Sequence, residues 1–118
     1  MPEKVEVNFK ALTHKQVLDY YYQNPNEIEK GLHSIMKEVS VFRGRIDLVA
    51  RDKNEKLCLI EVVHRSHYDN QYWKKKLCRY RCALRKMGEQ IYRCNNLEAR
   101  LLIKHPGCET QDVTHTQG

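Results

Sequence analysis

Residues 44–63, GRIDLVARDKNEKLCLIEVV, decide the fold of this chain of 118 residues. Two apolar runs, 45–51 and 57–63, are separated by the polar segment 52–55. This pattern predicts two strands joined by a hairpin. The second run is too apolar for an edge strand, so we expect it in the middle of a sheet.

Each predicted strand of the hairpin carries one acid among apolar residues, Asp47 in the first and Glu61 in the second. Burying a carboxylate is costly unless it has a partner. A hairpin can bring the two acids side by side, where they repel each other unless a cation or a proton lies between them. A hard divalent ion such as Mg²⁺ takes oxygen ligands and meets this demand. The alternative is that each acid pairs with a nearby arginine, for example Arg45 or Arg65.

Outside the hairpin, the sequence predicts two helices and two further strands. The predicted elements are, in chain order, helix 13–23, strands 35–41, 45–51 and 57–63, helix 71–87 and strand 97–104. Thr13 and Gln16 form a capping-box pattern at the first helix, and Gly88 is expected to end the second. The second helix has one apolar stripe, made of Trp73, Leu77, Tyr80, Leu84 and Met87.

This order of elements is typical of an α/β domain with an αβββαβ core, in which helices flank a small mixed sheet. We expect a single domain over residues 1–105, because a chain of this size suits one core. The polar segment 106–118 is expected to be a disordered tail.

The positive charge is concentrated in one quarter of the chain. Residues 64–93 carry a net charge of +7, and the rest of the chain sums to −1. The basic residues of this segment are Arg65, Lys74, Lys75, Lys76, Arg79, Arg81, Arg85, Lys86 and Arg93. Such a patch favours an anionic partner such as nucleic acid, and a solvated helix face is the alternative.

Composition excludes other classes. No apolar run approaches the length of about 18 residues that spans a membrane, and the N-terminus has no signal-peptide core. We therefore expect an intracellular protein, cytoplasmic or nuclear, that is not secreted and has no membrane partner. The five cysteines include no CxxC pair, so we expect free thiols. A zinc site at Cys78 and Cys82 with His64 or His67 is the weaker alternative.

The spacing of the two acids leads to a family resemblance. Asp47, an interval of 14 residues, and then Glu61-Val62 after an apolar run resemble the core motif of the PD-(D/E)XK nuclease superfamily. More narrowly, residues 24–32 (NPNEIEKGL), Glu38-Val39 and 44–48 resemble the C-terminal nuclease domain of NucS-type endonucleases and related RecB-like domains.

The hairpin is also similar to a second small family. Residues 44–47 and Glu61-Val62, followed by Arg65-Ser66, resemble the YraN-like predicted nucleases. Taken together, the resemblances span roughly residues 13–104 and imply a restriction-endonuclease-like fold.

The resemblance implies a metal-dependent endonuclease that hydrolyses phosphodiester bonds, with DNA the favoured nucleic acid. Asp47 and Glu61 would hold Mg²⁺ or Mn²⁺, with the main-chain carbonyl of Val62 as a third ligand. The residues expected to hold the phosphate backbone are Lys74, Lys75, Arg79, Arg81, Arg85 and Lys86. Domains of this kind often act as dimers or in larger assemblies, so a homodimer and a protein-interaction subunit both stay open.

Three departures from the family pattern bear on catalysis. The lysine expected two residues after Glu61 is Val63, and the acid expected early in the first helix is His14. The glutamine four residues before Tyr80 is Lys76. Either Lys76 has taken over the role of the missing lysine, or the site has decayed. The alternative to an active nuclease is therefore an inactive nuclease-fold module that binds nucleic acid or assembles with partners.

Overall fold

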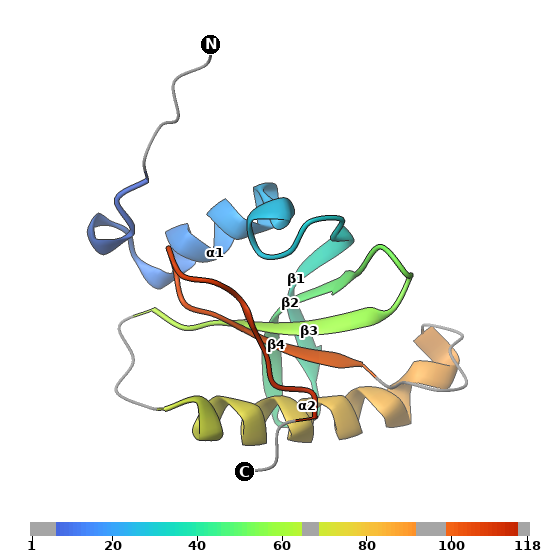
Figure 1. Ribbon diagram of the computed structural model, residues 1–118. Helices are drawn as coiled ribbons and strands as arrows, with labels where there is room; N and C mark the ends of the chain where they lie inside the picture. Colours follow the sequence, from blue (N-terminus) through green and yellow to red (C-terminus); the bar gives the residue numbers. More distant parts are fainter. Residues whose placement is uncertain (1–6, 65–68, 92–98, 116–118) are drawn as a thin grey trace.

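In the computed structural model, a five-stranded sheet lies between two helices, α1 on one face and α2 on the other (Figure 1). The structure describes residues 7–64, 69–91 and 99–115; of residues 85–91 only the helical backbone is described. The elements are η1 Phe9–Ala11, α1 His14–Gln23, η2 Pro25–Glu27, β1 His33–Val41, β2 Gly44–Arg51, β3 Leu57–Val62, α2 Asn70–Ile91, β4 Arg100–Lys104 and β5 Gln111–Asp112.

The strands follow one another across the sheet in the order β1-β2-β3-β4-β5. The β3–β4 pair is parallel, because α2 connects these two strands, and the other pairs are antiparallel. All six residues of β3 are buried. The expected mixed sheet flanked by helices, with the most apolar strand in its interior, is therefore confirmed.

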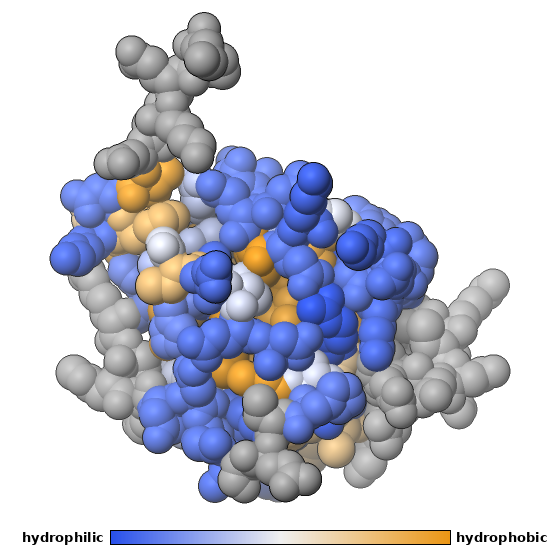
Figure 2. Space-filling model, viewed as in Figure 1, coloured by the Kyte–Doolittle hydropathy of each residue, from blue (hydrophilic) through white to orange (hydrophobic). Residues whose placement is uncertain are grey.

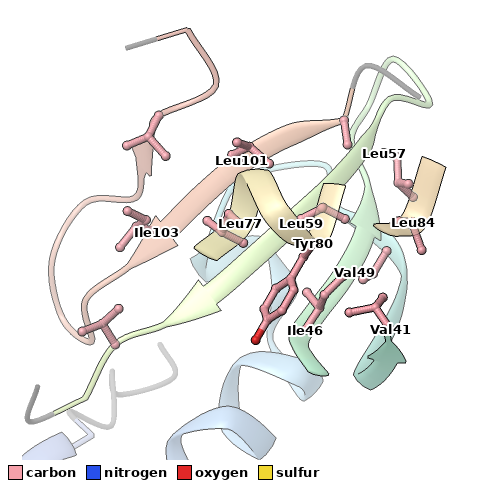
Figure 3. Close-up of a cluster of buried hydrophobic side chains, with 13 residues drawn as sticks. Val41, Ile46, Val49, Leu57, Leu59, Leu77, Tyr80, Leu84, Leu101 and Ile103 are labelled. Carbon is pink, nitrogen blue, oxygen red and sulfur yellow. The ribbon is translucent and has the colours of Figure 1, made fainter. Parts of the chain in front are cut away.

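Alternation along the strands divides the core into two layers. Leu59 of β3 belongs to the layer beneath α2, together with Leu77, Tyr80 and Leu84 of the predicted helix stripe (Figure 3). Ile60 belongs to the opposite layer, beneath α1. On the face drawn in Figure 2, hydrophilic residues predominate, as expected for a sheet whose apolar residues are covered on both sides.

Local signals predicted the start of α1 and the β2–β3 hairpin correctly. Gln16 N–H donates to the Thr13 hydroxyl at 3.2 Å, and Thr13 N–H donates to the Gln16 side chain at 2.9 Å, which completes the capping box. In the hairpin loop, the Asp52 carboxylate accepts hydrogen bonds from Asn54 N–H and Lys56 N–H, each at 2.9 Å. These bonds fold the loop so that Leu57 returns beside Arg51.

The end of α2 differs from the prediction. We expected Gly88 to end the helix, but α2 continues to Ile91. Glycine stops a helix when it adopts a left-handed conformation, and Gly88 has helical backbone instead. The first residues predicted for the last strand, 97 and 98, lie outside the described residues, and β4 begins at Arg100.

The segment after Pro106 also differs from the disordered tail that we expected. Its β5 pairs antiparallel with β4, and Val113 is buried in the α2 layer. The Thr114 hydroxyl accepts a hydrogen bond from Leu101 N–H at 2.9 Å, which fixes the segment further. One apolar side chain and an open sheet edge suffice to order an otherwise polar segment. Within the described residues, no helix is long and apolar enough to cross a membrane.

Candidate active site

The β2–β3 hairpin brings the two acids of the sequence motif together at one end of the sheet. Leu48 and Ile60 form the last pair between β2 and β3, and the residues next to them, Asp47 and Glu61, line the same cavity. Glu61 alternates with Leu59 and therefore lies on the face covered by α2. The prediction that the hairpin places the acids side by side is confirmed by this register.

Among the described residues, the partners of Asp47 are a backbone N–H and a histidine, not an arginine. Its Oδ2 accepts a hydrogen bond from Val62 N–H at 3.0 Å and lies 3.5 Å from His14 Nε2. Arg45, proposed as an alternative partner, instead lies 4.0 Å from a carboxylate oxygen of Glu38. Arg65 lies outside the described residues. The Asp47 side chain, 18% exposed, can still be reached from solvent.

Glu61 is the most unusual group of the site. The residue is only 3% exposed, and within the described structure its Oε1 has no hydrogen-bond partner. Burial raises the pKa of the Glu61 carboxyl well above its usual range, and the neighbouring Asp47 raises it further, whereas the Lys76 ammonium opposes both effects. A buried carboxylate with a free oxygen calls for a cation or a proton.

His14 occupies the place where the family resemblance implies an acid. Its Nε2 lies 3.0 Å from the carbonyl oxygen of Val62, which is the atom implied as a third metal ligand. The tautomer with a proton on Nε2 donates to this carbonyl. Pairing with the Asp47 carboxylate raises the pKa of His14, although partial burial lowers it. The first helix therefore contributes to the site with a nitrogen donor where an acid was implied.

Lys76 of α2 supplies a cation to the same site. It lines a cavity of about 140 Å³ together with His14, Asp47, Glu61, Val62, Val63, His64 and Trp73. Its Nζ lies 5.0 Å from the centre of the Trp73 ring and 5.8 Å from that of Tyr80, which limits the positions open to the ammonium. The cavity thus brings together residues from α1, β2, β3 and α2.

For three residues that line the cavity, the structure adds to what the sequence predicted. Trp73 was expected in the core, but it is half-buried and lines the cavity. His64 also lines it, while its Nε2 lies 2.9 Å from the carbonyl oxygen of Leu12. Val63, which stands where the family resemblance implies a lysine, is 5% exposed and packs into the α2 layer. Its side chain supplies no positive charge to the site. No local sequence pattern predicts that Trp73 and His64 line this cavity, because their positions there depend on how α1 and α2 pack on the sheet.

The predicted phosphate-binding residues lie in different surroundings along α2. Lys75 and Arg79 are exposed, and Lys74 is partly exposed. Arg81 Nη1 donates to the carbonyl of Ala99 at 3.3 Å, which directs it towards the start of β4. The side chains of Arg85 and Lys86 are not among those described. Tyr80 is 3% exposed and forms part of the core.

The donor set fits magnesium better than zinc. Among the described residues, no group of three His, Cys, Asp or Glu side chains is arranged to hold a metal ion. The cysteine–histidine zinc alternative therefore has no support there, and His67 lies outside those residues. Mg²⁺ is commonly held by one or two carboxylates and keeps several waters. Asp47 and Glu61, with the free Oε1 of Glu61 beside an open cavity, fit that requirement.

A five-stranded mixed sheet between two helices defines a domain of nuclease-like fold. The chain belongs to the endonuclease NucS C-terminal domain family, whose profile matches residues 13–93. No curated protein matches the sequence significantly.

Two solved structures share the fold. One is the crystal structure of a repair endonuclease from Pyrococcus abyssi, with a TM-score of 0.58, 22% identity, and coverage of 89% of this chain and 40% of that one. The other is EndoMS in a complex with double-stranded DNA, with a TM-score of 0.60, 18% identity, and coverage of 91% and 42%. The chain thus spans about two fifths of the length of each of these proteins.

Proposed function

We propose that this protein is a metal-dependent endonuclease of the PD-(D/E)XK type that acts on DNA, with Asp47 and Glu61 as the metal-binding carboxylates. The observation that carries the proposal is the buried Glu61 carboxylate, which lies opposite Asp47 and has an oxygen without a partner. Membership of the NucS C-terminal domain family and the double-stranded DNA bound to EndoMS support DNA as the substrate.

In this proposal, a bound Mg²⁺ or Mn²⁺ supplies an activated water and stabilises negative charge on the phosphate. The chain's own residues do the rest. Val62 N–H fixes the Asp47 carboxylate at 3.0 Å, so that its orientation does not depend on solvent. His14 Nε2 lies 3.5 Å from the same carboxylate oxygen, Oδ2. Lys76 places a positive charge beside the acids. It takes the role of the family's lysine, whose position in this chain is occupied by Val63.

The second candidate is a nuclease-fold module that binds DNA without cutting it. One observation favours it: His14 and Lys76 already place two nitrogen groups around the acid pair, and His14 Nε2 is on the carbonyl of Val62. In this alternative, the His14 imidazole and the Lys76 ammonium occupy the space beside the two acids that a metal ion would occupy in an active family member. The two candidates differ in whether a divalent ion binds at all.

Metal binding is the first measurement. We expect isothermal titration of Mn²⁺, and more weakly of Mg²⁺, to show binding to the wild type that is lost in the Asp47→Ala variant. Trp73 is the sole tryptophan and lines the cavity, so its fluorescence should change in the same titration. Asp19→Ala is the matched control and should bind as the wild type does, because Asp19 of α1 pairs with Lys37 of β1 and does not line the cavity.

Absence of heat and of a fluorescence change in both the wild type and Asp47→Ala would contradict the metal-dependent nuclease. Binding that survives in Asp47→Ala would place the ion elsewhere and would contradict the assignment of the ligands. Metal binding by the wild type alone would then justify a cleavage assay on duplex and branched DNA.

The exposed lysines of α2 should set the salt dependence of DNA binding. We expect Lys74→Gln/Lys75→Gln to weaken binding and to lower the slope of log K against log salt by roughly 1 to 2, because each phosphate contact contributes about 0.9. The control is Lys53→Gln/Lys56→Gln, which removes the same charge from the hairpin loop at the other end of the sheet. Fluorescence anisotropy in EDTA at several salt concentrations measures the affinity and the salt slope of each variant. Equal slopes for the two variants would contradict a DNA interface on α2.

A further inference from the structure

The tip of the β1–β2 hairpin presents an aromatic ring to solvent. Val41 pairs with Gly44, so Phe42 and Arg43 form a two-residue turn. Phe42 is 73% exposed, the highest value among the large hydrophobic residues described as exposed. The Arg43 guanidinium lies 5.2 Å from the centre of its ring. A ring at this position contributes little to the core.

The turn residues do not match the requirements of the turn. Two-residue hairpins favour Asn-Gly, Asp-Gly or Gly at the central positions, because the backbone there adopts positive φ angles. Here Arg43 has a φ of +60°, a conformation in which a long side chain is strained. Because Ser34, Glu38 and Glu55 also have a positive φ, the exposure of Phe42, rather than the conformation of Arg43, points to contact with a partner.

The tip is fixed against the basic helix. Gly44, which follows the turn, lies against the ring of Tyr80, and a Cβ atom on Gly44 would come within 2.7 Å of the Tyr80 hydroxyl oxygen. In Figure 3, Tyr80 lies beside Ile46 of β2 and reaches towards the start of this strand. The same Tyr80 ring lies 5.8 Å from the guanidinium carbon of Arg79. Because glycine allows this close approach, the start of β2 packs directly against Tyr80 of α2.

Two arginines, Arg43 and Arg45, lie at the tip, and Arg45 Nη2 is 4.0 Å from Glu38 Oε1. Arg45, with a side chain 63% exposed, follows the tip on β2, and Asp47 is two residues further along the same strand. Gly44, the first residue after the turn, lies three residues before Asp47 on β2, which is roughly 10 Å at the rise of a β-strand. At about 3.4 Å per nucleotide along one DNA strand, this separation corresponds to roughly three nucleotides.

We propose that Phe42 is a nucleotide-binding residue that stacks on an unpaired or unstacked DNA base a few nucleotides from the cleavage position, while Arg43 and Arg45 hold the adjacent phosphates. The inference rests on the proposed function for the identity of the partner. It adds a preference for DNA with unpaired bases, because an exposed ring can stack on a base only where the base is accessible. Arginines beside the ring favour a polyanion over a neutral protein surface.

The test is DNA binding in EDTA, which requires neither a metal ion nor cleavage. The probes are a labelled duplex and a duplex of the same sequence with a short unpaired stretch. We expect Phe42→Ala to weaken binding to the second probe by at least about fivefold, the lower limit for loss of one stacked base. Binding to the fully paired duplex should change less than twofold. Phe42→Trp should restore binding to the second probe.

Met36→Ala is the matched control, because Met36 is also exposed on β1 but pairs with Val49, away from the tip. It should bind both probes as the wild type does. Equal affinities of Phe42→Ala and wild type for both probes, or an equal loss on both, would overturn the inference. If Phe42→Ala loses affinity for the second probe alone while the wild type binds no metal, the inference is supported and the proposed nuclease is contradicted. Failure of the inference and failure of the proposed function are therefore distinguishable.

Discussion

We expect the Glu61→Gln variant to cut DNA at least about 10³-fold more slowly than the wild type in Mg²⁺ or Mn²⁺, which corresponds to about 4 kcal/mol in the activation free energy. The change keeps the shape of the side chain and removes the charge that would bind the ion. Asp47 is the one other acid among the described residues that line the cavity, so no further carboxylate there can replace Glu61. Initial rates on an end-labelled duplex, with enzyme in excess, measure the effect.

The same variant should be at least as stable as the wild type without metal. Glu61 is buried beside the negative charge of Asp47, and a neutral amide avoids both the desolvation of a carboxylate and that repulsion. We therefore expect the melting temperature in EDTA to rise by at least about 2 °C. DNA affinity in EDTA should be nearly unchanged, because the raised pKa of Glu61 leaves this carboxyl largely protonated near neutral pH without metal.

Glu109→Gln serves as the control, because Glu109 is exposed after the end of β4 and is not among the residues that line the candidate active site. It should retain the cleavage rate and the stability of the wild type. A Glu61→Gln variant that cuts DNA at the wild-type rate would contradict the proposed role of the acid pair. A large fall in the melting temperature of Glu61→Gln would contradict the argument that the buried Glu61 carboxyl destabilises the fold.

The second large effect concerns Arg100, which connects three parts of the fold. Its guanidinium lies 2.7 Å from Glu29, 3.0 Å from Asp52 and 3.0 Å from Asp112. The Asp52 side chain is only 5% exposed. Burial disfavours its charge, but hydrogen bonds from backbone N–H groups and from Arg100 outweigh this effect and hold the pKa of Asp52 below its usual value. Removal of Arg100 would leave a buried carboxylate without its countercharge.

We expect Arg100→Met to lower the free energy of unfolding by about 3–5 kcal/mol at pH 7, the range found when one partner of a buried ion pair is removed. Asp52 and Asp112 both have lowered pKa values, so the stability they contribute is present above their unfolded pKa values and is lost as the pH falls through the folded ones. The difference between variant and wild type should therefore narrow below about pH 4. Urea denaturation at pH 7 and at about pH 3 measures both quantities.

Arg51→Met is the matched control, because Arg51 donates only to the carbonyl of Glu55, at 3.0 Å, and has no carboxylate partner within the described structure. We expect it to cost about 1 kcal/mol or less. Asp52→Asn combined with Arg100→Met should recover part of the loss, because the uncompensated charge is then absent. A loss of under about 1 kcal/mol for Arg100→Met would show that this network adds little to stability.

The sequence predicted those parts of the protein that local rules decide. Alternation and apolar runs predicted β2 and β3, the capping box predicted the start of α1, and the stripe of α2 identified the side chains that pack on the sheet. The pairing of Asp47 with Glu61 followed from the hairpin alone, because its short loop fixes the register. These features depend on residues close together in the chain.

Long-range packing decided the rest. His14 reaches the carbonyl of Val62 across 48 residues, Arg100 reaches Glu29 across 71, and β5 is ordered by its contact with β4. Local sequence carries no signal for such contacts, since they arise only when α1, α2 and the last strands dock on the sheet. The sequence by itself determined the fold and the acid pair, and the tertiary structure decided which nitrogen groups surround that pair.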